Sequence, residues 1–301
     1  MLPYVIIKIE FKNKTNTIII NGNKFQIMQQ SQPMNKNENK NKPVIFIDGS
    51  YYCFHRFYSI KRWFKNAHPE ITLEDPSKNE VFVEKFKKTF VETIRSLPSN
   101  LGVSDDAIII VGKDCPRKDI WRMELYDTYK GTRDQERGQV VGPFFEMAYQ
   151  SLFEQAGAQL ILSHPRLESD DCIALSVKYI ISPETDIKII TSDRDYLQLA
   201  IRPNIQIFDL SLKNISEGHD PKKDLFCKIV MGDSSDNISS VLKKCGPKTA
   251  IKCFENREYF DERMKKEDAY LKLELNKTLV DFDCIPEQYK EEFMKEYNGK
   301  I

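Results

Sequence analysis

Two acidic clusters, each directly behind an apolar run able to form a buried strand, constrain this chain more than any other feature. They are Glu168 to Asp171 (ESDD) and Thr191 to Asp195 (TSDRD). Their five carboxylates would repel one another at close range and could not all stay ionised without neighbouring positive charge. A hard divalent cation such as Mg²⁺, which prefers oxygen ligands, would neutralise them. The clusters therefore predict a metal site, and such a site favours phosphodiester chemistry.

Apolar runs alternate with helical patterns through the middle of the chain, which predicts an α/β fold. Strands are predicted at Val44 to Ile47, Ala107 to Val111, Gln159 to Leu162, Ile187 to Thr191 and Ile205 to Phe208. Helices are predicted between them, among others at 144–156 and 170–181. This alternation favours a largely parallel, doubly wound sheet flanked by helices.

Acidic residues follow several of these predicted strands. Asp48 ends the first strand, Asp114 comes shortly after the second, and Asp193 follows the fourth. In doubly wound sheets, ligands bind beyond the carboxyl ends of the strands. We therefore expect these residues to converge with Glu168 and Asp170, although they are far apart in the sequence.

The two ends of the chain differ from this core. Residues 4–28 contain β-branched runs and an Asn-Gly turn signal, which predict a short β extension, whereas Gln29 to Lys42 has the polar composition of a linker. A helix predicted from Asp220 ends at Gly232, and the remainder predicts only small helices. The expected domains are residues 1–43, 44–231 and 232–301.

Two segments carry basic residues suited to phosphate. Residues 113–142 lose regular apolar spacing and mix Lys and Arg with acids, as functional loops or mobile helical excursions do. Gly246 to Ala250 (GPKTA) places Pro at a first helical position, where backbone N–H groups can bind phosphate. Nearby lysines, among them Lys243, Lys244 and Lys248, lead us to expect that a duplex backbone docks there.

Composition excludes some classes of protein and is silent on others. Lys plus Arg equals Asp plus Glu at 45 each, so net charge gives no attraction to nucleic acid. The seven cysteines are scattered without a Cys-x-x-Cys pair, so no zinc site or redox motif is indicated. Scattered cysteines in odd number fit a reducing, intracellular compartment best. No apolar run reaches 18 residues, so we expect a soluble cytoplasmic or nuclear protein without a membrane partner.

Together these motifs resemble, in content and order, the 5′-nuclease superfamily. That superfamily includes flap endonucleases, the 5′ nuclease domains of bacterial DNA polymerase I, and bacteriophage 5′-3′ exonucleases and ribonuclease H. The resemblance covers about residues 44–286. The segments that carry it are Ile45 to Ser50 (IFIDGS), Tyr129 to Arg133 (YKGTR), Glu168 to Asp171, Thr191 to Asp195, Gly232 to Ile238 (GDSSDNI), Gly246 to Ala250 and Leu279 to Pro286 (LVDFDCIP).

The resemblance implies a PIN-like nuclease core, with an arch at about residues 113–142 and a C-terminal helix-three-turn-helix region that binds DNA. It implies a 5′-3′ exonuclease or flap endonuclease that uses two Mg²⁺ ions, which Mn²⁺ could replace. The expected substrates are DNA with a 5′ flap, a nick or a free 5′ end, or RNA in an RNA–DNA hybrid, in replication or repair. The replication partners stay unidentified.

Specific residue roles follow from the resemblance. The first metal ion would be held by Asp48, Asp114, Glu168 and Asp170. The second would be held by Asp193, Asp195 and Asp233, with Asp171 and Asp236 acting through bound water. The expected catalytic cations are Lys130, Arg133 and Arg56. The expected nucleic-acid contacts are Lys130, Arg133, Lys243, Lys244, Gly246, Lys248 and Thr249.

One departure from the superfamily concerns the turn before Gly246. Residues 239–245 (SSVLKKC) are longer by one than the glycine-rich turn of relatives and contain no glycine. Glycine permits positive φ and close approach to a phosphate. Whether this turn binds K⁺, as it does in many relatives, therefore stays open.

Two alternative functions remain in view. A haloacid-dehalogenase-type phosphatase also places an Asp at a strand end, but it needs a second Asp two residues later, where this chain has Ser50. A non-catalytic nucleic-acid-binding protein would predict lost carboxylates, and the motifs here retain them. The sequence leaves open the preference among exonuclease, flap endonuclease and ribonuclease H activity.

Overall fold

The computed structural model describes residues 7–12, 15–20, 23–27, 42–132 and 135–301. The chain divides into two compact units, residues 1–38 and 39–301. In the first unit, β1 (Ile7–Lys12), β2 (Thr15–Ile20) and β3 (Asn23–Ile27) form an antiparallel sheet. These strands occupy the segment for which a β extension is predicted. Residues 29–41 of the predicted linker, which runs from Gln29 to Lys42, lie outside the described residues.

The second unit is built on a five-stranded sheet in which every pairing is parallel, in the order β6-β5-β4-β7-β8. The strands are β4 (Val44–Asp48), β5 (Ile108–Gly112), β6 (Leu160–Leu162), β7 (Ile187–Ile190) and β8 (Ile205–Phe208). The predicted parallel sheet is therefore confirmed, with each strand within one residue of its expected ends. The central strand, β4, is the one that delivers Asp48.

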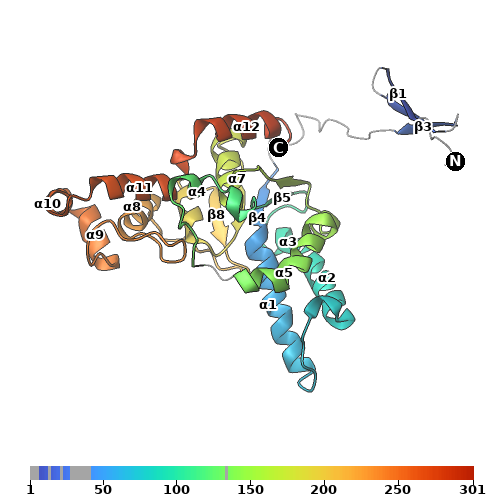
Figure 1. The fold of residues 1–301 in the computed structure, drawn as a ribbon, viewed down its shortest axis with the longest axis horizontal. Coiled ribbons are helices and arrows are strands. Elements are labelled where there is room, and N and C mark those ends of the chain that lie inside the picture. Colours follow the sequence, from blue (N-terminus) through green and yellow to red (C-terminus); the bar gives the residue numbers. More distant parts are fainter. Residues whose placement is uncertain (1–6, 13–14, 21–22, 28–41, 133–134) are drawn as a thin grey trace, which may run out of the picture. The chain divides into compact units, whose positions relative to one another are not determined.

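Helices cover both faces of this sheet, as Figure 1 shows. Ile45 and Ile47 of β4 pack in a core with α1 (Gly49–Ala67), α2 (Glu80–Arg95) and α5 (Gln135–Met147). Val44 and Phe46 point to the other face and pack in a core with α7 (Ser169–Leu175) and α12 (Glu287–Tyr297). Because alternate side chains of a strand face opposite sides of the sheet, a strand that is buried on both faces must be apolar throughout.

Two predicted helices have different bounds in the structure. The helix expected at 144–156 begins at Gln135 and continues through a π-helical turn, η3 (Ala148–Leu152), into α6 (Phe153–Gln155). The helix expected at 170–181 is α7 followed by the π-helical turn η4 (Ser176–Ile180). The short helices elsewhere are η1 (Pro76–Lys78), α3 (Leu97–Asn100), η2 (Arg117–Asp119), α4 (Arg122–Leu125), η5 (Arg194–Leu199) and η6 (Phe282–Cys284).

Helices also form the C-terminal part. The predicted helix after Asp220 is α8 (Pro221–Met231), and it ends at Gly232, whose φ of 72° is left-handed. Beyond it lie α9 (Pro247–Glu255), α10 (Arg257–Glu267) and α11 (Tyr270–Val280), and α8, α9 and α10 share a small apolar core. Among the helices that the structure describes, none is both long and apolar enough to span a membrane.

Gly49, which directly follows β4, leaves no room for a side chain. A Cβ built on Gly49 would lie 2.2 Å from Tyr149 Oη and 2.5 Å from the backbone oxygen of Gly112. We expect Gly49→Ala to lower the free energy of unfolding by about 1–3 kcal/mol, because the backbone of β5 must shift to relieve this overlap. Urea denaturation measures the change.

The matched control is Gly142→Ala, because a Cβ there meets no atom within 4 Å. We expect it to change the free energy of unfolding by about 1 kcal/mol or less. Equal effects of the two variants would contradict the tight packing at Gly49.

Candidate active site

The acids predicted to converge do so at the carboxyl edge of the parallel sheet. Asp48 ends β4 and caps α1, accepting a hydrogen bond of 3.1 Å from Tyr51 N and one of 3.2 Å from Thr191 Oγ1. Asp114 follows β5 and accepts hydrogen bonds from Ser169 N, at 2.7 Å, and from Ser50 Oγ. Both carboxylates are therefore fixed by neighbouring strands and helices.

A cleft of about 690 Å³ opens at this edge. It is lined by seven of the predicted site residues, together with neutral and basic neighbours. The seven are Asp48, Asp114, Lys130, Glu168, Asp170, Asp193 and Asp233. The structure thus brings residues separated by up to 185 positions into one cleft (48 to 233). Asp195 and Asp236 do not line the cleft, but they contact two lysines that do, Lys228 and Lys130 respectively.

The carboxylates of the cleft are costly to ionise together. Burial, followed by the charges of Asp114 and Asp193, raises the pKa of Asp48 to about 7. Burial and the neighbouring charges of Asp171 and Glu168 raise the pKa of Asp170 well above its usual range. A nearby cation would favour the ionised form of each.

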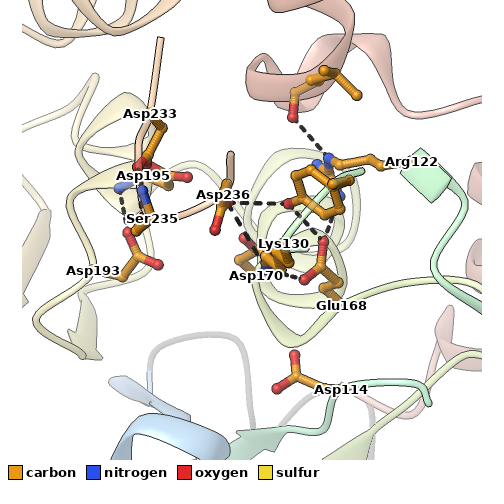
Figure 2. Close-up of polar contacts among 12 residues, drawn as sticks. Asp114, Arg122, Lys130, Glu168, Asp170, Asp193, Asp195, Asp233, Ser235 and Asp236 are labelled. Atoms are coloured by element: carbon orange, nitrogen blue, oxygen red, sulfur yellow. Dashed lines mark hydrogen bonds and ion pairs between the residues drawn. The ribbon is translucent and has the colours of Figure 1, made fainter. Parts of the chain in front are cut away.

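Two compact groups of carboxylates stand out among the described residues, and Figure 2 labels all of their members except Asp171. One consists of Glu168, Asp170 and Asp171, and the other of Asp195, Asp233 and Asp236. Within each group one oxygen of every residue lies within 4.8 Å of the others. Oxygen ligands at this spacing suit Mg²⁺ or Mn²⁺. Each group could hold a divalent cation, and each also contacts a lysine.

Lys130 contacts the first group. Its side chain is buried, and its Nζ pairs with Glu168 and lies 4.0 Å from Asp236 Oδ2. Lys130 lies within a tight turn, in which Gly131 N donates to Thr128 O at 2.9 Å. Its φ of 54° is left-handed. Burial alone would raise the pKa of Glu168, but the charges of Lys130 and Arg122 hold that pKa below its usual value.

Lys228 contacts the second group and was missed by the sequence analysis. It lies in the last turn of α8, and its Nζ pairs with Asp195 and lies 2.9 Å from Asp233 Oδ2. Although burial opposes it, this lysine lowers the pKa of Asp233 to about 2. A signal was present, because the helix predicted from Asp220 ends at Gly232, where the acidic segment Gly232 to Ile238 begins. The last turn of that helix must therefore lie beside this segment.

Arg122 was also missed, and it makes the densest set of contacts in the site. It is 2% exposed, and its Nη1 and Nη2 donate to Asp171 at 2.8 and 2.7 Å. Nη1 also donates to Glu168 at 3.1 Å, and Nε donates to Leu279 O at 2.8 Å. Trp121 Nε1 adds a bond of 3.1 Å to Asp171. Asp171 is thus occupied by protein donors.

The remaining predicted residues lie in several places. Arg56 donates to Thr93 Oγ1 at 3.0 Å and does not line the cleft. Arg133 lies outside the described residues. The predicted nucleic-acid contacts near α9 are on the surface: Lys243, Lys244, Gly246 and Lys248 are exposed, and Thr249 is half-buried. No side chain caps the first turn of α9; Pro247 has no amide hydrogen, and Thr249 N donates to Gly246 O at 3.0 Å.

Known proteins resemble this chain in sequence. Residues 43–226 match the family model for the 5′-3′ exonuclease N-terminal resolvase-like domain. A 5′-3′ exonuclease of Buchnera aphidicola (subsp. Acyrthosiphon pisum) is 31% identical over 71% of this chain and 71% of its own length. The 5′-3′ exonuclease of Bacillus subtilis is 24% identical over 81% of this chain and 84% of its own.

A solved structure also shares the fold. The T5 5′-exonuclease with bound zinc ions superimposes with a TM-score of 0.59 at 20% identity. The match covers 85% of this chain and 98% of that one. The predicted PIN-like α/β fold is therefore confirmed.

The buried Arg122 to Asp171 pair generates a stability prediction. Arg122→Met leaves Asp171 as an uncompensated buried charge, and we expect it to lower the free energy of unfolding by about 3–5 kcal/mol. Adding Asp171→Asn removes that charge and should recover part of the loss. Chemical denaturation of both variants measures this.

The control is Arg166→Met, because Arg166 pairs with Glu124 at the surface. Its effect should be below about 1 kcal/mol. A loss below about 1 kcal/mol in Arg122→Met would contradict the prediction that this substitution leaves Asp171 as an uncompensated buried charge.

The raised pKa of Asp48 predicts a pH dependence in the metal-free protein. Between the unfolded value of 3.8 and the folded value of about 7, the folded state binds more protons. Stability should therefore fall as pH rises through this window, by roughly 2–4 kcal/mol. Denaturation in EDTA at about pH 5 and pH 8 measures the change.

Asp48→Asn should remove this component. His55, whose pKa burial and Arg56 lower, acts in the opposite direction, so the difference between wild type and variant is the informative quantity. Identical pH profiles for the two proteins would contradict the assignment.

Proposed function

The chain belongs to the 5′-3′ exonuclease family and is a nuclease hydrolase, and we propose that it cuts phosphodiester bonds near the 5′ end of a DNA strand with the help of divalent metal ions. The observation that carries this proposal is the pair of carboxylate groups beside one cleft at the carboxyl edge of the sheet. DNA with a 5′ flap, a nick or a free 5′ end is the proposed substrate. RNA in an RNA–DNA hybrid is a further substrate of the same chemistry.

We assign the carboxylates to two Mg²⁺ ions. Asp48, Asp114, Glu168 and Asp170 would hold the first, and Asp193, Asp195 and Asp233 the second. Asp236, which belongs to the same compact group as Asp195 and Asp233, would act on the second ion through bound water. When bound, the ions would supply an activated water and stabilise charge on the phosphate and the leaving oxygen. Asp171 is better explained as the partner of Arg122, because Arg122 and Trp121 engage both of its oxygens.

The chain's own cations bind and orient the substrate in this proposal. We assign to Lys130, which lines the cleft and pairs with Glu168, a contact with the phosphate that is cut, where charge develops in the transition state. Lys228 also lines the cleft and neutralises Asp195 and Asp233. Arg133 is retained as a proposed phosphate contact. Arg56 is not, because its guanidinium is engaged by Thr93 away from the cleft.

A duplex backbone would dock at the start of α9 in this proposal. Exposed Lys243, Lys244 and Lys248 surround the uncapped first turn, and a helix N-terminus favours anions. Lys244 adopts a left-handed φ of 52°, the conformation that glycine usually provides in such turns. Phosphate contacts of this kind position the duplex without reading its sequence.

The alternatives fit less well. In a dehalogenase-type phosphatase, Ser50 would have to be an acid, and here its Oγ donates to Asp114. A non-catalytic binding protein has no need of buried carboxylates whose ionisation is this unfavourable.

The test uses a 5′-labelled flap oligonucleotide incubated with Mg²⁺. We expect the unmutated protein to release the flap. The double substitution Asp193→Asn with Asp195→Asn should reduce the rate by about 100-fold or more, because the proposed second metal ion loses two of its three carboxylate ligands. Product mapping on flap, nicked, blunt and hybrid substrates then defines the preference.

Asp105→Asn serves as the matched control, since Asp105 is an exposed acid that does not line the cleft. It should cleave at the wild-type rate. Cleavage that survives the double substitution would refute the site assignment, whereas binding without any cleavage by the unmutated protein would favour a non-catalytic role.

A further inference from the structure

Two buried hydroxyl groups near the acidic cleft have no hydrogen-bond partner among the described residues. They belong to Ser169, which is 2% exposed, and Tyr196, which is 0% exposed. An unpaired buried hydroxyl costs free energy, and buried polar groups in proteins are otherwise paired with protein atoms or with ordered water. Each of these two hydroxyls therefore indicates a small polar ligand that the surrounding side chains do not supply.

The two hydroxyls come from the elements that carry the two carboxylate groups. Ser169 begins α7 and stands between Glu168 and Asp170 of the first group. Tyr196 is in η5 and directly follows Asp195 of the second group. Because α7 and η5 pack against each other, the hydroxyls lie where the two acidic motifs meet.

Each side chain is held in place by its neighbours. The ring of Tyr196 packs edge-on against Phe282, with centroids 6.4 Å apart. Ser169 Oγ lies against the end of β5, because a Cβ built on Gly112 would overlap it. Burial, followed by the charge of Asp48, raises the pKa of Tyr196 well above its usual value, and the Ser169 hydroxyl opposes this rise. The two hydroxyls are thus near each other, but they do not meet the geometry of a direct hydrogen bond.

A water molecule would satisfy both hydroxyls at once. Buried waters typically make about three hydrogen bonds to polar groups that otherwise lack partners. Each hydroxyl can donate one hydrogen bond and accept others, so both can bond to the same water. The charges of Asp48 and Asp170, which act on Tyr196, would repel an anion. Two neutral hydroxyls offer fewer oxygens than a divalent cation takes.

We propose that Tyr196 and Ser169 hold a buried water molecule, and that this water ties η5 to α7 and so fixes the spacing of the two carboxylate groups. Tyr196 is then a positioning residue, since it acts on the metal ions only through the elements that carry their ligands. Ser169 N also donates to Asp114 at 2.7 Å, so a shift of α7 would move that carboxylate as well. The inference rests on the proposed function, because the binding of divalent ions by these groups is part of it.

The test titrates the nucleic-acid-free protein with Mn²⁺ and follows binding by electron paramagnetic resonance. We expect Tyr196→Phe and Ser169→Ala each to weaken Mn²⁺ binding by about 2- to 12-fold, the effect of one hydrogen bond. The double variant should bind no more weakly than the weaker single variant, because both substitutions remove the same water. The matched control is Tyr52→Phe, which removes a buried hydroxyl that donates to Phe90 O at 2.6 Å and should leave Mn²⁺ affinity unchanged.

Circular dichroism checks that the variants fold, which the preserved ring in Tyr196→Phe favours. A crystal structure of the unmutated protein should show a water within hydrogen-bonding distance of both hydroxyl oxygens. Losses that multiply in the double variant, or an equal loss in Tyr52→Phe, would overturn the proposal. A direct bond between the two hydroxyls, with no water, would overturn it as well.

The same titration separates this inference from the proposed function. Mn²⁺ binding that weakens in Tyr196→Phe, in a protein that does not cleave flaps, would contradict the nuclease proposal alone. Flap cleavage by the unmutated protein, together with a Mn²⁺ affinity that Tyr196→Phe leaves unchanged, would contradict this inference alone. An unmutated protein that binds no Mn²⁺ would contradict both.

Discussion

Repulsion between carboxylates gathered at one edge of the sheet is the constraint on which the rest of the structure depends. Parallel strands all end on that edge, so every acid placed behind a strand adds to the same negative field. Buried Arg122 and Lys130 and the partly buried Lys228 oppose it from three different elements. Burial and the charges of Asp114 and Asp193 still raise the pKa of Asp48 to about 7, so a further cation nearby would favour the ionised form of this carboxyl.

Arg122 also joins the site to the C-terminal part of the chain. Its bond to Leu279 O is accompanied by Gln198, whose side chain contacts Val280 O at 3.1 Å and Phe282 N at 3.0 Å. The family match ends at residue 226, yet residues 279–282 help to fix Arg122 and, through it, Asp171. The helical C-terminal part is thus a support of the acidic centre as well as a proposed docking surface for DNA.

The cleft is held by the most rigid part of the fold. Thr191 donates to Asp48 and Ser169 donates to Asp114, so both carboxylates are fixed beside the strands that end there. Asp48 ends β4 and also caps α1, because the helix begins where the strand ends. Acidic side chains held in this way suit the positioning of metal ions and a phosphate in the proposed function.

The sequence by itself determined the sheet and most of its acids, because continuous apolar runs identify strands buried on both faces, and an acid behind such a run is costly without a cation. Only the tertiary structure decided the roles of Arg122 and Lys228. Arg122 contacts Glu168, Asp171 and Leu279, which lie far away in the chain, so local periodicity contains no trace of those contacts. Lys228 is close in sequence to Asp233, but its pairing with Asp195 depends on folding. Lys130 shows the same limit. The segment Tyr129 to Arg133 predicted it as a catalytic cation, but its burial beside Glu168 and Asp236 depends on folding.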